Sequence, residues 1–193
     1  MIIEEGPRNV GKTFLIDSIQ NDRYYQMSFK LSFFNDYMKE YNKGYITDKI
    51  KSSKDMDFGY SIGKDLMLTK LFLQDLLSQS LIVDRGYVST CVYSEILERV
   101  PYIQISNHRY NISKLIRDTK IKIIFIYGRN PEKRTKDEMD GLSYEKQLKT
   151  YKRYEMLLKQ DGIYPIYFEN KFDDQSVTDF KNLINSLLED IYQ

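Results

Sequence analysis

Eight residues near the start of the chain have the types and spacing needed to hold a nucleoside triphosphate. Gly6, Gly11, Lys12 and Thr13 fill every fixed position of the P-loop pattern, G-x-x-x-x-G-K-[ST], and residues 6–13 are called the P-loop below. Its glycines let backbone N–H groups close around phosphate oxygens, and a helix N-terminus adds a favourable dipole. We expect Lys12 to reach the β- and γ-phosphates and the Thr13 hydroxyl to ligate Mg²⁺. The residues predicted to bind ATP are Gly6, Arg8, Asn9, Val10, Gly11, Lys12 and Thr13.

A second charged pair, Asp84-Arg85, follows the apolar residues Leu81, Ile82 and Val83. Such a run predicts a buried parallel strand with the two charges at its carboxyl end. A carboxylate there can hold Mg²⁺ through water, as a second anchor beside a P-loop threonine. The arginine offers a bidentate fork to phosphate, suited to the charge that grows during phosphoryl transfer. The plainer alternative is a structural salt bridge at a strand end.

Strands and helices must alternate along the chain to place these residues together. Apolar runs predict strands at residues 1–5, 24–28, 80–85, 122–127 and 163–168. Apolar residues at helical spacing predict helices at 12–21, 33–41, 61–79, 87–99, 143–159 and 177–191. Pro101 is expected to start a loop that ends in a short helix over 112–118.

This alternation predicts an α/β fold of the P-loop NTPase type. The expected architecture is a three-layer sandwich, with a five-stranded parallel sheet and helices on both faces. Residues 1–193 then form a single domain. Ligands bind at the carboxyl ends of the strands in such sheets, where the P-loop and Asp84-Arg85 both fall.

Composition limits the remaining classes of function. The net charge of +1 gives no long-range field that would favour nucleic acid or a membrane, although it leaves room for a local basic patch. The one cysteine, Cys91, excludes an internal disulfide and is interpreted as a small buried apolar residue. The one histidine, His108, argues against a histidine-based metal site and against a Ser-His-Asp triad. With no signal peptide or long apolar run in view, we expect a cytoplasmic protein without a membrane partner.

The segment Asp84-Arg85-Gly86-Tyr87-Val88-Ser89-Thr90-Cys91-Val92-Tyr93 resembles the thymidylate kinase family, and more broadly the nucleoside and nucleoside-monophosphate kinases. Asp84, Arg85, Ser89 and Tyr93 stand in register with the family's Asp-Arg, serine and aromatic positions. The resemblance implies that Asp84 helps to place the metal and that Arg85 bridges the donor and acceptor phosphates. It also implies acceptor contacts at Ser89 and Tyr93, and it is compatible with a homodimer.

Several departures from the family pattern concern the acceptor. Ser28-Phe29-Lys30-Leu31 stands where the family has an Arg-Glu-Pro run, and no glutamate follows until Glu40. A hydroxyl acceptor needs a base to take its proton, whereas a phosphate acceptor is already ionised and needs only positioning and charge neutralisation. Arg8 stands where the family often has a carboxylate for the sugar, and it can bind a phosphate instead.

Two further segments are predicted to complete the site. An acceptor-side segment spans about 29–64, and in it Lys30, Tyr60 and Lys64 are the candidate acceptor contacts. The alternative for Tyr60 and Lys64 is a core tyrosine and a solvated lysine at a helix start. A short basic lid spans about 129–141, and Arg134 is the candidate that closes over the γ-phosphate. A charge run of this kind can equally be a solvated surface.

The resulting hypothesis is an ATP- and Mg²⁺-dependent kinase that phosphorylates a nucleoside monophosphate, with a pyrimidine deoxynucleotide as the expected acceptor. Lys12, Arg85 and Arg134 are its expected catalytic residues, and Thr13 and Asp84 its expected metal ligands. Alternatives are a kinase for a deoxynucleoside, a nucleic-acid end or a modified base, and a protein that keeps nucleotide as a structural or regulatory ligand. Asn170-Lys171-Phe172-Asp173 also matches the guanine-reading pattern of GTPases, but Tyr87 stands where a GTPase needs glycine.

Overall fold

In a computed structural model of the chain, residues 2–19, 63, 65, 82–128 and 143–192 are described. The strands of this part are β1 (Ile2–Glu5), β2 (Ile82–Asp84), β3 (Lys122–Tyr127) and β4 (Ile166–Glu169). Its helices are α1 (Lys12–Ile19), α5 (Tyr87–Ile96), α6 (Tyr102–Ile116), α8 (Tyr144–Gln160) and α9 (Asp174–Tyr192).

The described strands form one parallel sheet in the order β2-β1-β3-β4. Glu4 pairs with Asp84 on one side of β1 and with Ile124 on the other, and all three ladders are parallel. The α/β class with a parallel sheet is therefore confirmed. The described sheet has four strands rather than the five expected, because the strand predicted at 24–28 lies outside the described residues.

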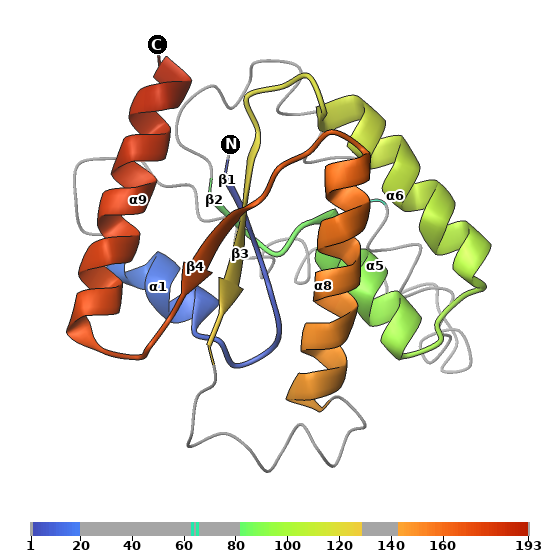
Figure 1. Cartoon of the computed structure of the whole chain (residues 1–193), viewed down its shortest axis with the longest axis horizontal. Coiled ribbons are helices and arrows are strands. Elements are labelled where there is room, and N and C mark those ends of the chain that lie inside the picture. Colours follow the sequence, from blue (N-terminus) through green and yellow to red (C-terminus); the bar gives the residue numbers. More distant parts are fainter. Residues whose placement is uncertain (1, 20–62, 64, 66–81, 129–142, 193) are drawn as a thin grey trace, which may run out of the picture.

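The apolar side chains of β1, β2 and β3 alternate between two separate cores. Ile3 of β1 and Phe125 of β3 belong to the core under α5, α6 and α8, whereas Ile2 and Ile124 belong to the core under α1 and α9. Figure 1 shows these two groups of helices on opposite sides of the sheet. Burial on both faces explains why β3 reads as a continuous apolar run instead of an alternating one.

The prediction of a loop after Pro101 is wrong, because helix α6 occupies this part of the chain. The structure has one helix over Tyr102–Ile116, with Pro101 as its N-cap residue, in place of a loop and a short helix at 112–118. Proline is well tolerated at the start of a helix because the first turn leaves its N–H groups without partners inside the helix. Ile105, Ile112 and Ile116 are buried, so the helical spacing is present but diluted by the polar residues between them.

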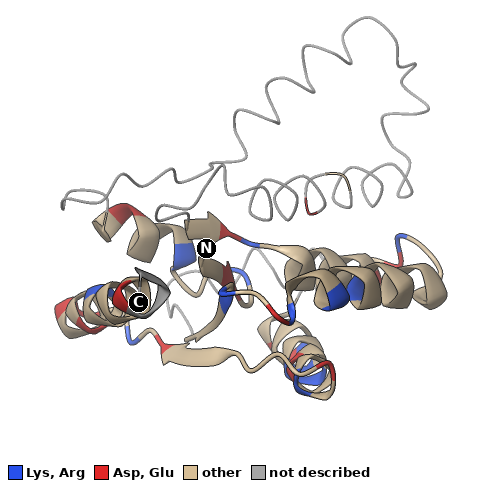
Figure 2. Cartoon of the chain, turned by 90° about the horizontal axis from the view of Figure 1, so that it is seen from above, with Lys and Arg blue, Asp and Glu red and all other residues tan. Residues whose placement is uncertain are grey.

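Boundaries elsewhere differ from expectation by a few residues. The last strand begins at Ile166 rather than 163, and the last helix begins at Asp174 rather than 177. Ser143 caps α8, since its hydroxyl accepts a 3.2 Å hydrogen bond from the Lys146 N–H. Residues of both charges lie on α8 and on α9, as Figure 2 shows.

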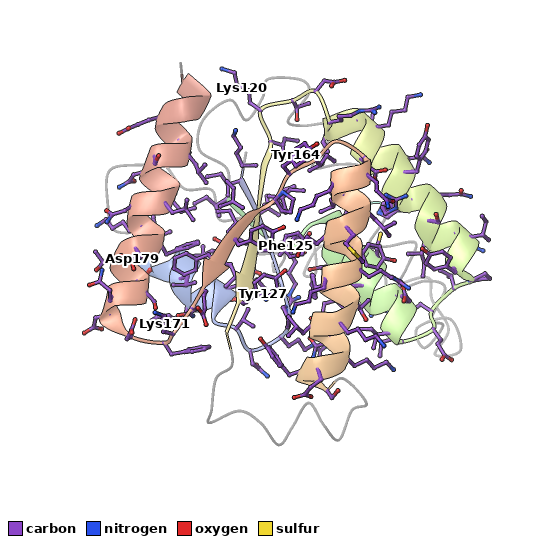
Figure 3. All side chains as sticks on the ribbon, in the orientation of Figure 1. Lys120, Phe125, Tyr127, Tyr164, Lys171 and Asp179 are labelled. Carbon is purple, nitrogen blue, oxygen red and sulfur yellow. The ribbon has the colours of Figure 1, made fainter. Side chains whose placement is uncertain are left out.

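The carboxyl ends of the strands lie at one edge of the sheet. In Figure 3, Tyr127 and Lys171 lie near this edge and Lys120 lies near the opposite one. The loop between β1 and α1 lies at the same edge as the arrowhead of β3 (Figure 1). Among the described residues, every helix is too short or too polar to cross a lipid bilayer.

Candidate functional site

The loop after β1 has a backbone that requires glycine at two of its positions. Gly6 and Gly11 have φ angles of +141° and +81°. A Cβ at Gly6 would collide with the Ile126 carbonyl oxygen, and one at Gly11 would collide with the Asn170 amide. Asn9 also has a positive φ, of 61°, a conformation that asparagine tolerates better than most residues. Residues 6–11 thus wind closely against β3 and the chain after β4.

Lys12 lies folded over this loop. Its ammonium donates hydrogen bonds to the Gly6 carbonyl at 3.1 Å and to the Pro7 carbonyl at 2.5 Å, and the residue is only 4% exposed. Burial lowers the pKa of Lys12 well below its ordinary value, and the positive charge of Arg85 lowers it further. A phosphate beside this ammonium would act in the opposite direction and favour the charged form.

A hydrogen bond joins Thr13, at the start of α1, to Asp84, at the end of β2. The Thr13 hydroxyl lies 2.7 Å from Asp84 Oδ2, so the hydroxyl donates to the carboxylate. Asp84 Oδ1 is buried without a hydrogen-bond partner among the described residues. Oxygen ligands of this type suit Mg²⁺, which commonly takes one or two carboxylates together with phosphates and water. The pair therefore fits the metal expected at these two residues.

Arg85 is held in the site from several directions. Its NH1 donates to the Gly6 carbonyl at 3.2 Å, to the Tyr93 hydroxyl at 3.0 Å and to the Tyr151 hydroxyl at 3.4 Å. Burial alone would lower the pKa of Arg85, but Tyr151, Tyr93 and Asp84 raise it above its ordinary value. The guanidinium is therefore a fixed cation beside the P-loop.

The backbone of Arg85 is also constrained, with a φ of +70° and an N–H that donates to the Glu4 carbonyl at 2.9 Å. Left-handed geometry costs free energy at a residue other than glycine, and it persists only where the surroundings impose it. Here it turns the chain from β2 into α5, which aims the guanidinium back toward the loop.

A second guanidinium, that of Arg8, lies near the same tyrosine. The ring centroid of Tyr93 is 5.0 Å from Cζ of Arg85 and 5.5 Å from Cζ of Arg8. Gln147 of α8 joins the group, because its Oε1 accepts from the Arg8 N–H at 2.7 Å and from the Tyr93 hydroxyl at 2.9 Å. Tyr93 thus lies within cation–π distance of two arginines.

The carboxylate of Glu5 caps helix α5. Its two oxygens accept from the backbone N–H groups of Gly86, Val88 and Ser89 at 3.0, 3.1 and 3.0 Å. The Ser89 hydroxyl also donates to Glu5, and it lies 2.6 Å from the Tyr151 hydroxyl of α8. Because helix N-termini carry unsatisfied N–H groups and positive partial charge, a carboxylate here is stabilising.

The loop after β4 touches the P-loop. The Asn170 amide donates to the Val10 carbonyl at 3.0 Å, and Asn170 is 2% exposed. Asp173, the last residue of the GTPase-like pattern, caps α9 by accepting from the Ser176 N–H at 2.7 Å. The Ser176 hydrogen bonds lower the pKa of Asp173.

The structure brings together most of the residues that the sequence singled out. The P-loop residues, Asp84, Arg85, Ser89 and Tyr93 all lie at the carboxyl edge of the sheet around Gly6. Lys30, Tyr60, Lys64 and Arg134 lie outside the described residues. Among the described residues, no three His, Cys, Asp or Glu side chains form a metal-binding group.

Four contributors to the site were not predicted: Glu5, Gln147, Tyr151 and Asn170. Gln147 and Tyr151 are four residues apart and therefore share a face of α8, and the apolar spacing that predicted this helix gave no sign of a polar role for either. Glu5 offered one signal, because it is an acidic residue in a short strand and stands immediately before the first glycine. The chain matches no family model and no curated protein.

Proposed function

We propose that the protein is an ATP- and Mg²⁺-dependent kinase that phosphorylates a nucleoside monophosphate. The observation that carries the proposal is the meeting of two cations at one atom. Lys12 Nζ and Arg85 NH1 donate to the same Gly6 carbonyl oxygen, at 3.1 and 3.2 Å. Phosphoryl transfer requires positive charge around the transferred group, and catalysis there is mostly positioning and electrostatic stabilisation.

The contact between Thr13 and Asp84 supports the metal part of the proposal. When bound there, Mg²⁺ would neutralise charge on the β- and γ-phosphates. The threonine hydroxyl and the carboxylate would hold the ion on the α1 side of the loop, while Arg85 approaches from the α5 side. In this arrangement the donor triphosphate lies along the loop from Gly6 to Thr13.

The arginines around Tyr93 support a charged acceptor. Arg8 and Arg85 both lie against this ring, and a phosphate group fits a site with two guanidiniums better than an uncharged nucleoside does. Glu5 is occupied by the N-terminus of α5, so it is poorly placed to serve as a base for a hydroxyl acceptor. We therefore favour a monophosphate acceptor over a deoxynucleoside.

The finer features of the proposal extend it to the rest of the chain. They are a five-stranded P-loop kinase fold in one domain, a lid at about 129–141 with Arg134, and acceptor contacts from Lys30, Tyr60 and Lys64. A pyrimidine deoxynucleotide as acceptor and a homodimer belong to the same proposal. The capping role of Asp173 argues against a GTPase that uses this side chain to read guanine.

ADP release tests the proposal directly. The protein is incubated with ATP, Mg²⁺ and, in separate reactions, nucleoside monophosphates, deoxynucleosides and oligonucleotides with free 5′ ends. We expect ADP release to require a monophosphate and to be highest with a pyrimidine deoxynucleotide. Release only with deoxynucleosides or with nucleic-acid ends would overturn the choice of acceptor, and release with none of the three classes would overturn the kinase itself.

A further inference from the structure

Glu4 is a charged side chain in an apolar place. It is 0% exposed, and neither of its carboxylate oxygens has a hydrogen-bond partner among the described residues. A buried carboxylate is costly unless it is paired, hydrogen-bonded or bound to a metal. Protonation would remove the charge but would leave a hydroxyl without an acceptor. The neighbouring Glu5 differs, because its oxygens accept hydrogen bonds from three backbone N–H groups. The burial of Glu4 without such partners therefore needs a physical explanation.

The strand register places Glu4 beside Asp84. The two residues are partners in the parallel ladder between β1 and β2. Side chains two positions apart on a strand point to the same face of a sheet. Ile2 and Ile82 both belong to the core under α1, so Glu4 and Asp84 point to the α1 face as well. This is the face on which Thr13 contacts Asp84.

Within the described part of the chain, three side-chain oxygens at this edge therefore have no hydrogen-bond partner: both oxygens of Glu4, and Oδ1 of Asp84. The Lys12 ammonium does not supply one, because it is directed to the Gly6 and Pro7 carbonyls. Hard oxygen donors from two carboxylates and a hydroxyl are the ligands that Mg²⁺ and Mn²⁺ prefer. The unpartnered oxygens thus have the chemistry of a divalent-cation site.

We infer that Glu4 is a further carboxylate of the metal site, and that with Asp84 and Thr13 it lets the protein bind a divalent cation before any nucleotide arrives. Glu4 acts on the ion directly or through one coordinated water. The inference rests on the proposed function only in taking Thr13 and Asp84 as metal ligands. A P-loop with one carboxylate depends on the phosphates for most of its metal affinity, whereas a second carboxylate adds affinity that belongs to the protein.

Manganese binding to the nucleotide-free protein tests this inference. Mn²⁺ is titrated into the protein, and the free ion is followed by its electron paramagnetic resonance signal. We expect one bound Mn²⁺ in the wild type and a loss of affinity of at least roughly tenfold in Glu4→Gln, the lower end of the range for losing a group that supports a metal site. Asp84→Asn is expected to lose affinity in the same way.

Glu169→Gln is the matched control, because Glu169 also ends a strand at this edge but is exposed. Wild-type affinity is expected for that variant. No Mn²⁺ binding by the wild type, or equal affinity in Glu4→Gln and the wild type, would overturn the inference. The titration contains neither nucleotide nor acceptor, so its result does not depend on whether the kinase proposal holds.

A melting experiment separates metal binding from folding. Added Mg²⁺ should raise the melting temperature of the wild type and of Glu169→Gln, but it should raise that of Glu4→Gln much less. Glu4→Asp is a second variant that keeps the charge and shortens the side chain, for use where Glu4→Gln does not fold. Its Mn²⁺ affinity should fall below that of the wild type, and an unchanged affinity would contradict the inference.

Discussion

Thr13 and Asp84 are 71 positions apart in the chain, yet the hydroxyl of one lies 2.7 Å from the carboxylate of the other. This contact joins the two sequence motifs that carry the functional argument. It exists because β2 pairs directly with β1, so the residue that ends β2 lies beside the helix that follows β1.

Lys12→Met should lower the rate of phosphoryl transfer by about 100-fold or more, the usual effect of losing one donor that stabilises a transition state. Methionine keeps the unbranched stem but removes the ammonium that contacts Gly6 and Pro7. The rate is measured as ADP release. Lys149→Met, an exposed substitution on α8, should keep the wild-type rate. Turnover by Lys12→Met at the wild-type rate would exclude the role given to Lys12.

Arg85→Lys should leave ATP binding largely intact and reduce transfer by about 10³-fold or more, in the range known for arginines that stabilise the transferred phosphoryl group. Lysine keeps the charge, but its compact ammonium lacks the planar guanidinium that can offer two parallel N–H groups to a phosphate. Calorimetric titration with ATP gives the binding constant, and ADP release gives the rate. Equal losses in ATP affinity and in transfer rate would mean that Arg85 contributes only to ATP binding.

Tyr151→Phe should reduce both stability and transfer. The hydroxyl contacts Ser89 and Arg85 inside the protein, so its loss should cost about 1 kcal/mol of unfolding free energy. Tyr154→Phe is the matched control. The Tyr154 hydroxyl donates a 3.1 Å hydrogen bond to Glu95, and neither residue contacts the P-loop through this bond. Denaturant unfolding should show a loss in both variants, and the rate should fall only in Tyr151→Phe.

Cys91 should resist thiol reagents while the protein is folded. The residue is 0% exposed within the core under α5, as the sequence predicted, and burial raises the pKa of its thiol. Because the thiolate is the reactive form, both effects protect it. Labelling with a chromogenic disulfide reagent should be slow in buffer and fast in denaturant. Fast labelling of the native protein would show that α5 opens readily.

Asp173 should make stability depend on pH in the acid range. Its pKa is lowered in the folded protein by the Ser176 hydroxyl and N–H, so its contribution is present above the unfolded value of about 3.9 and is lost as pH falls through the folded value. Asparagine also caps helices but does not titrate. Between about pH 3 and pH 7, the melting temperature of Asp173→Asn should therefore fall less than that of the wild type. Parallel pH curves would contradict this assignment.

The parts of the site that could be predicted depend on local chemistry and on a general rule of sheets. The P-loop is recognisable because its pattern requires glycine at two positions, lysine at one, and serine or threonine at one. Asp84 and Arg85 could be placed next to it because parallel strands end at a common edge. Both predictions needed only residue types, spacing and the βαβ alternation.

The remainder depends on contacts that no local pattern encodes. Gln147 reaches Arg8 across 139 positions, and Tyr151 reaches Ser89 across 62. A tyrosine on an apolar helix face looks like any core residue until the partner of its hydroxyl is known. Helix α6 was missed for a different reason, because Pro101 at its start was interpreted as the beginning of a loop.

The cap that Glu5 places on α5 also has a consequence for how the chain folds. Its partners lie 81 to 84 positions away, so the first turn of α5 is satisfied only after a long loop has closed. The entropy cost of closing a long loop must be met before contacts between distant residues can stabilise the fold, so such contacts form late and slowly. We therefore expect β1 to join the sheet in the same kinetic step that completes the first turn of α5. A folding intermediate that precedes this step would have neither the P-loop nor Arg85 in place.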